Sequence, residues 1–517
     1  MSKFANFRVL RTAKIYGEIP ADVYQWLRIM VYCILCGIEL YARISGRAAE
    51  ESVIMPETVV FSESYVWTFL GQIGIVFIAI LVGNVLRTWI PCLRKLYIPS
   101  AIIGGFLVLI IKQIPAFGEQ IDNATMEIVT YHCLGLGFAA MALKTAKSEK
   151  KVSTVKVVES GAIMAGGYLI QAIVGLFISI ALSFAGDYFY AAGLILPMGF
   201  GQSTGSALSW GSNYEANYGF EGGSTFGLAT AAIGFIVGSV IGVIYLNIAM
   251  RKGLVKPRRA EAAEKERVIV EDPNEIPNSE SVDKMSIQLC FVALAYVLAY
   301  GVMRLLALIP IKAIGDLAWG LNFLWTLLCA YLIKLVMSAL KKKGAIKRYY
   351  TNDHLMDRIS GMMFDIMICA GIIAIDIQDV YRNLWMLIAV CGIGTIVTFW
   401  YVRKTTKYTY KNYEIESFMT NFGTLTGTLS TGMILLREID PDYVTPASSN
   451  IVLQNFPSIP FLAPLLLTLG FAGSSRTNTF IMLGVYIILF LAYNTFLFRR
   501  RIFRKRYADK PEEVWTE

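Results

Sequence analysis

Two runs of glycine, serine, threonine and amide residues interrupt otherwise apolar stretches of the chain. The first is Gly199-Phe-Gly-Gln-Ser-Thr-Gly-Ser206, and the second is Asn421-Phe-Gly-Thr-Leu-Thr-Gly-Thr-Leu-Ser-Thr-Gly432. Irregular backbone at membrane depth is tolerated only where protein or a water-filled cavity surrounds it. A helix that breaks there presents N–H groups that suit a carboxylate, and its free carbonyl and hydroxyl oxygens suit Na⁺. The pattern predicts a binding site for an anion and a hard cation, although close helix packing would use the same small residues.

Three further polar residues fall inside predicted membrane spans. Asp365 lies near the middle of an apolar stretch, where a carboxylate is costly enough to indicate a function. We expect Asp365 to bind Na⁺ or H⁺, unless backbone or hydroxyl groups satisfy it at a helix contact. His132 has the chemistry of a proton relay, but an interhelical hydrogen bond is the favoured interpretation. Gln171 suits a substrate contact and a bond between helices equally well.

The composition is that of a membrane protein. Of 517 residues, 56% are hydrophobic and 16% are charged, and the mean hydropathy is +0.55. Because an average globular chain has about 25% charged residues, disordered, collagen-like and disulfide-scaffold classes are excluded. The net charge of +9 comes from short Lys and Arg runs between apolar segments, which orient spans rather than bind nucleic acid. Only Cys33 and Cys36 form a C-x-x-C pair, without a second pair or a nearby His, so no metal or redox cofactor is expected.

Apolar windows long enough to cross a bilayer predict eleven helices. They are 66–86, 98–114, 124–143, 159–184, 222–249, 286–308, 317–337, 359–375, 384–402, 450–473 and 477–498. A weaker candidate at 24–42 contains Arg28 and Glu39. The basic loops at 87–97, 144–158 and 250–285 are expected in the cytoplasm.

These orientations predict an inverted repeat. Between Asp187 and Arg251 the chain must cross an odd number of times, so 188–212 is predicted to be a re-entrant hairpin. The second half has the same order in the opposite orientation, with its hairpin at 415–436. Interrupted segments at matching positions of inverted halves indicate a secondary transporter. The predicted fold is therefore an all-α polytopic membrane protein with two inverted five-span repeats, each with a re-entrant hairpin, plus one extra C-terminal span and a possible N-terminal helix.

The same pattern predicts the division of the chain. We expect an N-terminal extension at 1–60, a first repeat at 61–250, a charged cytoplasmic linker at 251–284, a second repeat at 285–473, and an extra span with a basic tail at 474–517.

Four features within about 66–473 resemble the bacterial sodium:glutamate symporter family. Ile98-Pro-Ser-Ala-Ile-Ile-Gly-Gly105 is similar to that family's Ile-Pro segment and paired glycines, and Gln171 matches a Gln in its fourth span. Gly201-Gln-Ser-Thr-Gly205 aligns with a Gly-His-Gly-Thr-Gly hairpin motif, and the run at 421–432 occupies the place of the second hairpin. The resemblance implies Na⁺-driven uptake of glutamate by alternating access, and a homodimer.

The first hairpin also departs from the family motif. Gln202, Ser203 and Phe200 stand where the motif has His, Gly and Gly, so a different organic acid or a neutral amino acid remains the alternative substrate. The choice between Na⁺ and H⁺ as coupling ion also stays open. A channel is less favoured because a pore does not need paired inverted hairpins. An enzyme is disfavoured because the chain has two His and lacks H-E-x-x-H and G-x-x-x-x-G-K-S/T motifs.

The candidate site follows from the two hairpins. The expected substrate-binding residues are Gln202, Ser203, Thr204, Gly205, Ser206, Asn421, Thr426, Gly427, Thr428, Ser430 and Thr431. The expected Na⁺ ligands are Asp365, Gln171 and Thr424. Expected partners are a glutamate-like substrate, Na⁺, the lipid bilayer and a second copy of the chain. The expected location is the bacterial cytoplasmic (inner) membrane, with the linker and the C-terminus in the cytoplasm.

Overall fold

The computed structural model describes residues 64–118, 120–144, 153–255, 283–310, 312–346, 350–440 and 444–502. Throughout these segments the regular structure is helical, with no strand. The predicted N-terminal extension with its candidate helix at 24–42, the C-x-x-C pair, most of the linker and the end of the tail lie outside the described residues.

The elements of the first half of the chain are α2 (Ser64–Trp89), α3 (Pro91–Lys95), α4 (Ser100–Ile111), α5 (Pro115–Gly118), α6 (Asn123–Leu143), α7 (Thr154–Ala185), η3 (Ala192–Leu194), α8 (Ile195–Pro197), η4 (Met198–Gln202), α9 (Thr204–Tyr218) and α10 (Gly223–Arg251). The long helices of the first half are α2, α6, α7 and α10, and one interrupted segment lies between α7 and α10.

The second half has a similar order and then continues for one more long helix. Its elements are α11 (Lys284–Ala307), α12 (Lys312–Gly320), α13 (Asn322–Lys342), α14 (Asp353–Ala374), α15 (Ile377–Arg382), α16 (Leu384–Thr409), α17 (Glu414–Thr426), α18 (Leu429–Arg437), α19 (Ala447–Leu453), α20 (Asn455–Gly473), α21 (Arg476–Leu497) and α22 (Arg499–Ile502).

Every predicted span overlaps a helix, although 317–337 and 450–473 each extend over two helices and not all the helices are long enough to cross a bilayer. Eight helices in the described part of the chain have the length and hydropathy of a membrane span, and the bent pair α19–α20 makes a ninth. The helix predicted at 98–114 is shorter than expected. Its 12 residues extend about 18 Å, because Pro99 precedes it and Lys112 follows it.

Polar residues at the helix starts explain several of these boundaries. Asp122 accepts from the N–H groups of Ala124 (3.1 Å) and Thr125 (3.0 Å), so α6 begins after it. Asp283 caps α11 in the same way. The cap oxygen satisfies N–H groups that have no partner within the helix, which is why these short-chain acids mark element starts in an apolar sequence.

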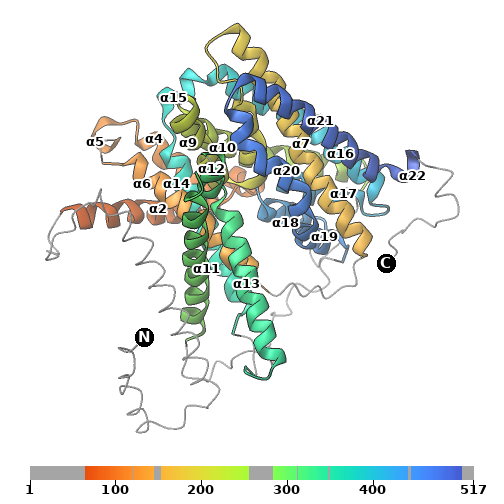
Figure 1. Cartoon of the computed structure of the whole chain (residues 1–517), viewed down its shortest axis with the longest axis horizontal. Coiled ribbons are helices and arrows are strands. Elements are labelled where there is room, and N and C mark those ends of the chain that lie inside the picture. The colour runs from red at the N-terminus through yellow and green to blue at the C-terminus, as the bar shows by residue number, and fades with distance from the viewer. Residues whose placement is uncertain are drawn as a thin grey trace.

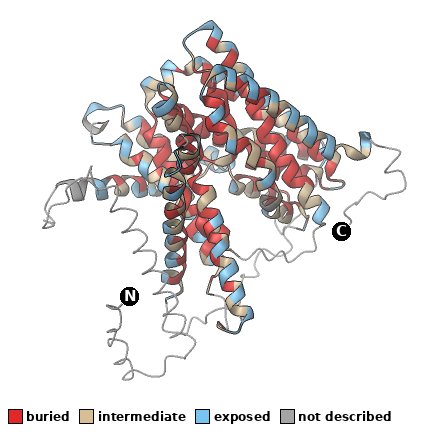
Figure 2. Ribbon diagram, viewed as in Figure 1, coloured by how far each residue is buried: buried red, intermediate tan, exposed pale blue. Residues whose placement is uncertain are grey.

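The helices pack as two groups that meet around the interrupted segments. In the first group, α14 packs on α6, α4 and α2, and α13 packs on α6 and α11. In the second group, α7 packs on α16, α20 and α21, while α10 packs on α9 and α17. Figure 1 shows α11 and α13 side by side and projecting away from α7, α20 and α21. Burial is concentrated where the helices face one another, whereas the outer faces are exposed (Figure 2).

Glycines set how closely the helices approach within each group. At Gly83 of α2, an added Cβ would overlap the Ser100 carbonyl and lie 2.8 Å from the Gly104 nitrogen on α4. At Gly74 on the same helix, an added Cβ would meet nothing within 4 Å. The α2–α4 pair therefore depends on Gly83 for backbone contact, and Gly74 has no such role.

We expect Gly83→Val to lower the thermal unfolding midpoint of the detergent-solubilised protein by several degrees, because forcing extra atoms into close packing costs about 1–3 kcal/mol. Gly74→Val is the matched control on the same helix and is expected to leave the midpoint unchanged. Equal midpoints for the two variants would contradict this account of the α2–α4 contact.

Candidate functional site

The first interrupted segment breaks at Ser203. The leg before it, Ala192–Gln202, changes from a 3₁₀ turn to an α turn and then a π turn, and the backbone at Ser203 is extended. Gly199 and Gly201 weaken regular helix in this leg. A new helix, α9, starts at Thr204 and runs to Tyr218. Its first turn therefore points unpaired N–H groups at the break.

Three hydroxyl groups at this break have no hydrogen-bond partner in the described structure. They belong to Ser203, Thr204 and Ser206, which are 2%, 0% and 0% exposed. A buried polar atom without a partner costs free energy, so such atoms are rare in native proteins. Their grouping at one helix N-terminus indicates a place for a polar ligand.

The second interrupted segment is a tight helical hairpin. Helix α17 ends at Thr426, and α18 begins after Thr428, whose side chain accepts from the Thr431 N–H at 3.3 Å. The two legs touch backbone to backbone, because a Cβ on Gly423 would lie 2.6 Å from the Gly432 Cα. Asn421, on the first leg, has an unpartnered Oδ1 and is 2% exposed.

The two breaks meet on one glycine face of α10. A Cβ on Gly234 would lie 2.6 Å from the Thr426 carbonyl oxygen and 2.9 Å from the Phe200 ring. One turn later, a Cβ on Gly238 would lie 2.9 Å from the Thr426 hydroxyl. Segments more than 200 residues apart in the chain are thus brought together because α10 has no side chains at these positions.

Helix α7 contributes another wall of the same region. Gln171 donates from Nε2 to the Leu425 carbonyl (2.9 Å) and to the Thr398 hydroxyl (3.0 Å), and its buried Oε1 has no partner. Gly167 faces Leu425, and Gly175 meets Gly193 of the first interrupted segment backbone to backbone. Gly167, Gln171 and Gly175 are spaced i, i+4 and i+8, which places them on one face of α7. This spacing is visible in the sequence.

The predicted site residues do not all lie together. Those of the two breaks converge, but Gln202 and Thr428 are half-buried and Ser430 is exposed. Thr424 is buried and donates to the Thr420 carbonyl. Asp365 is exposed on α14, and the next turn of that face contacts α2 through Cys369 and the Val76 carbonyl. Thr204 contacts α14 at Gly371. Gly371 lies about 120° around the helix axis from Asp365, so Asp365 is not on the face that contacts Thr204.

The interhelical hydrogen bond predicted for His132 is present. The His132 Nδ1 lies 2.7 Å from the Tyr296 hydroxyl, between α6 and α11.

The converging segments carry no charged side chain. None occurs in α7 after Glu159, in 195–212, in α10 before Arg251, or in 417–429. In the described part of the chain there is also no cluster of three or more His, Cys, Asp or Glu suited to a metal ion. A cation there would be bound by neutral oxygens, and an anion by N–H and hydroxyl groups.

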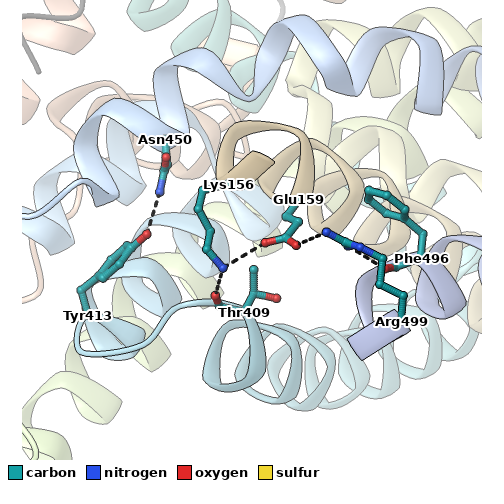
Figure 3. A network of polar contacts seen from close by, with 7 residues as sticks. All are labelled: Lys156, Glu159, Thr409, Tyr413, Asn450, Phe496 and Arg499. Atoms are coloured by element: carbon teal, nitrogen blue, oxygen red, sulfur yellow. Dashed lines mark hydrogen bonds and ion pairs between the residues drawn. The ribbon is translucent and has the colours of Figure 1, made fainter. Parts of the chain in front are cut away.

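A charged network lies at the other end of α7. Figure 3 shows Glu159 between Lys156 (3.1 Å) and Arg499 (2.7 Å), while Lys156 also donates to the Thr409 carbonyl at 2.7 Å. At the opposite end, Arg476 donates to the Ser183 carbonyl at 3.2 Å. The C-terminal segment α21–α22 is therefore fastened to α7 at both ends.

Residues 68–434 match the family described as sodium/glutamate symporter. The chain belongs to this family. No curated protein matches the chain. The symporter is thus a multi-pass membrane transporter and not an enzyme, and Na⁺ serves it as coupling ion rather than as a resident cofactor.

We expect Glu159→Gln to lower the free energy of unfolding of the symporter by about 3 kcal/mol, because it leaves two largely buried cations without their counter-charge. The matched control is Glu221→Gln, which removes an exposed ion pair with Arg382 and should cost less than about 1 kcal/mol. Thermal unfolding in detergent compares the two variants, and an equal effect would contradict the assigned role of Glu159.

A pH dependence is expected at Asp379, in the short helix α15. Its pKa is raised by burial and by the neighbouring carboxylates of Asp376 and Glu215. A raised pKa in the folded state favours the protonated form, so stability is lost as the pH rises through that pKa. Asp379→Asn removes the penalty, and its unfolding midpoint should exceed that of wild type at pH 7 by more than at pH 4. A constant difference over this range would contradict the shift.

Proposed function

We propose that this symporter couples Na⁺ to the uptake of glutamate, or a similar anionic amino acid, at the site where its two interrupted segments meet. The observation that carries the proposal is the group of unpartnered, buried polar atoms on Ser203, Thr204, Ser206, Asn421 and Gln171. Family membership supports the identity of ion and substrate.

The two helix N-termini suit the two carboxylates of glutamate. Helices α9 and α18 both begin at a break, and a helix N-terminus carries a partial positive charge and free N–H groups. One carboxylate would bind at Thr204, with Ser203, Gln202, Gly205 and Ser206 around it. The other would bind at α18, where Thr428, Ser430 and Thr431 supply hydroxyl groups beside Gly427, Thr426 and Asn421.

The neutral oxygens between the breaks suit Na⁺. We assign the ion to Gln171 Oε1 and Thr424, close to the carbonyl groups that end α17. Asp365 remains a second candidate ligand, on a different face of α14. Because the site itself has no charged side chain, the charge of the substrate would be balanced by the co-bound ion, which accounts physically for coupling.

The wider arrangement belongs to the same proposal. The two interrupted segments would enter the bilayer as re-entrant hairpins at 188–212 and 415–436, in repeats of opposite orientation at 61–250 and 285–473. Alternating access would follow from movement of the helix group around α7 and α10 relative to the group around α6 and α14. We place the symporter in the bacterial cytoplasmic membrane as a homodimer, with the linker at 251–284 and the C-terminus in the cytoplasm.

A different organic acid or a neutral amino acid is the second candidate substrate. Its support is the half-buried Gln202 at the first break, which provides a neutral amide where a charged recognition group would favour an acidic substrate.

The direct test is uptake of labelled glutamate into proteoliposomes. We expect uptake to require an inward Na⁺ gradient and to collapse when K⁺ replaces Na⁺ or when an ionophore abolishes the gradient. Uptake of another acid or a neutral amino acid in place of glutamate would transfer the proposal to that substrate. Uptake driven equally by a proton gradient would overturn the assignment of Na⁺.

Thr204→Val tests the site itself. The change preserves the shape of a side chain whose methyl group packs on Gly371 and removes a hydroxyl that has no protein partner. We expect at least tenfold slower uptake at low glutamate, because a hydrogen bond to a charged group is worth about 1.5–3 kcal/mol, with an unchanged unfolding midpoint.

Three further variants complete this test. Thr428→Val should also slow uptake, and Thr428→Ser should restore it because the hydroxyl is retained. Thr326→Val is the control, since this buried threonine of α13 bonds only its own helix at the Asn322 carbonyl. If Thr204→Val and Thr428→Val both transport as wild type does, the two breaks do not form the substrate site.

A further inference from the structure

Tyr168 lies at the first break and has no role in the site as described so far. It lies on α7, three residues before Gln171, and is 2% exposed. A Cβ on Gly201 would lie 2.7 Å from the Tyr168 Cζ and 3.0 Å from its hydroxyl oxygen. The missing side chain at Gly201 therefore lets the hydroxyl group reach the backbone of the break.

The Tyr168 hydroxyl makes no hydrogen bond to the residues that the structure describes. Two tyrosines nearby do find such partners. The buried Tyr214 donates to the Leu469 carbonyl at 2.9 Å, and the half-buried Tyr190 donates to the Gly473 carbonyl at 3.0 Å. A buried tyrosine normally pairs its hydroxyl, and the Tyr168 hydroxyl lies where a ligand at the break could supply that partner.

The two sides of the break differ in electrostatic character. The helical leg that ends at Gln202 directs its last carbonyl groups toward the break, which makes that side partially negative. Helix α9 begins on the other side and is partially positive. Tyr168 lies under Gly201, on the negative side, where its oxygen can accept a hydrogen bond from a cationic group.

We propose that Tyr168 is a specificity residue that binds the ammonium group of an amino-acid substrate, while α9 binds the adjoining carboxylate. The site then recognises the two charged groups on one substrate carbon across a single break, and it selects an α-amino acid over a dicarboxylate that lacks the amino group. The inference rests on the proposed function of the site and adds the residue that recognises the amino group of the substrate.

The test compares competition by two unlabelled compounds, glutamate and glutarate, in Na⁺-driven uptake of labelled glutamate. Glutarate has the same two carboxylates but no ammonium group. We expect wild type to need at least tenfold more glutarate than glutamate for half inhibition. In Tyr168→Phe, which keeps the ring under Gly201, the ratio should fall about tenfold because only glutamate loses affinity.

The control is Tyr401→Phe. Tyr401, on α16, is also a buried tyrosine against α7. Its unpartnered hydroxyl lies against Gly166, and its ring packs on Phe490 of α21. We expect Tyr401→Phe to keep the wild-type inhibition ratio. The unfolding midpoint of both variants separates a loss of recognition from a loss of folding.

Three outcomes would overturn the inference. The first is an unchanged glutarate-to-glutamate ratio in Tyr168→Phe, which would leave Tyr168 as a packing residue. The second is a raised Na⁺ requirement in that variant at a constant ratio, which would make the hydroxyl an ion ligand. The third is equal inhibition by both compounds in wild type. In all three cases Na⁺-driven uptake by wild type still stands as a separate result, so the proposed function is tested independently.

Discussion

A helix that stops inside an apolar environment leaves backbone N–H and carbonyl groups without partners, and the rest of this structure depends on that constraint. Each unpaired group costs free energy where no water is present. The breaks at Ser203 and Thr428 are therefore surrounded by other helices, and every segment that contacts them is shaped to approach closely. The same unpaired groups are what make the breaks chemically useful, because they present opposite partial charges side by side without any ionised side chain.

Helices α7 and α10 bring the two breaks together. Gly234 and Gly238 let the second break rest on α10, and Gly167 and Gly175 let α7 contact both interrupted segments. The amide nitrogen of Gln171 donates to the Leu425 carbonyl at the end of α17, and its amide oxygen has no hydrogen-bond partner. Helix α7 therefore both holds the breaks in place and lines the site. The contacts that make the site rigid also position its polar atoms. Helix α21 packs on α7, and the Glu159 network joins α7 to Arg499 of the following α22, so the extra helix is part of the same packed group.

Much of the candidate site was predictable from the two polar runs, because glycine and hydroxyl residues are unusual in apolar stretches of this length. Both runs proved to contain a helix break, and their positions in the two halves follow the predicted order. Asp365 was a weaker inference. Hydropathy places it in a span, but it cannot say which side of the helix faces the site, and the structure puts Asp365 on the face that continues toward α2. Tyr168 was missed because a tyrosine in an apolar helix reads as an ordinary core residue.

The sequence by itself determined the class of protein, the helical segments, the two places where helices break, and the family, because these follow from local composition and from motifs that are continuous in the chain. Only the tertiary structure decided which breaks meet, which helix faces line them, and which buried polar atoms are left without a partner. Those properties depend on contacts between residues hundreds of positions apart. A contact of that kind is set by the shape of two packed surfaces, such as Thr426 against Gly234, and neither surface can be recognised until both are folded.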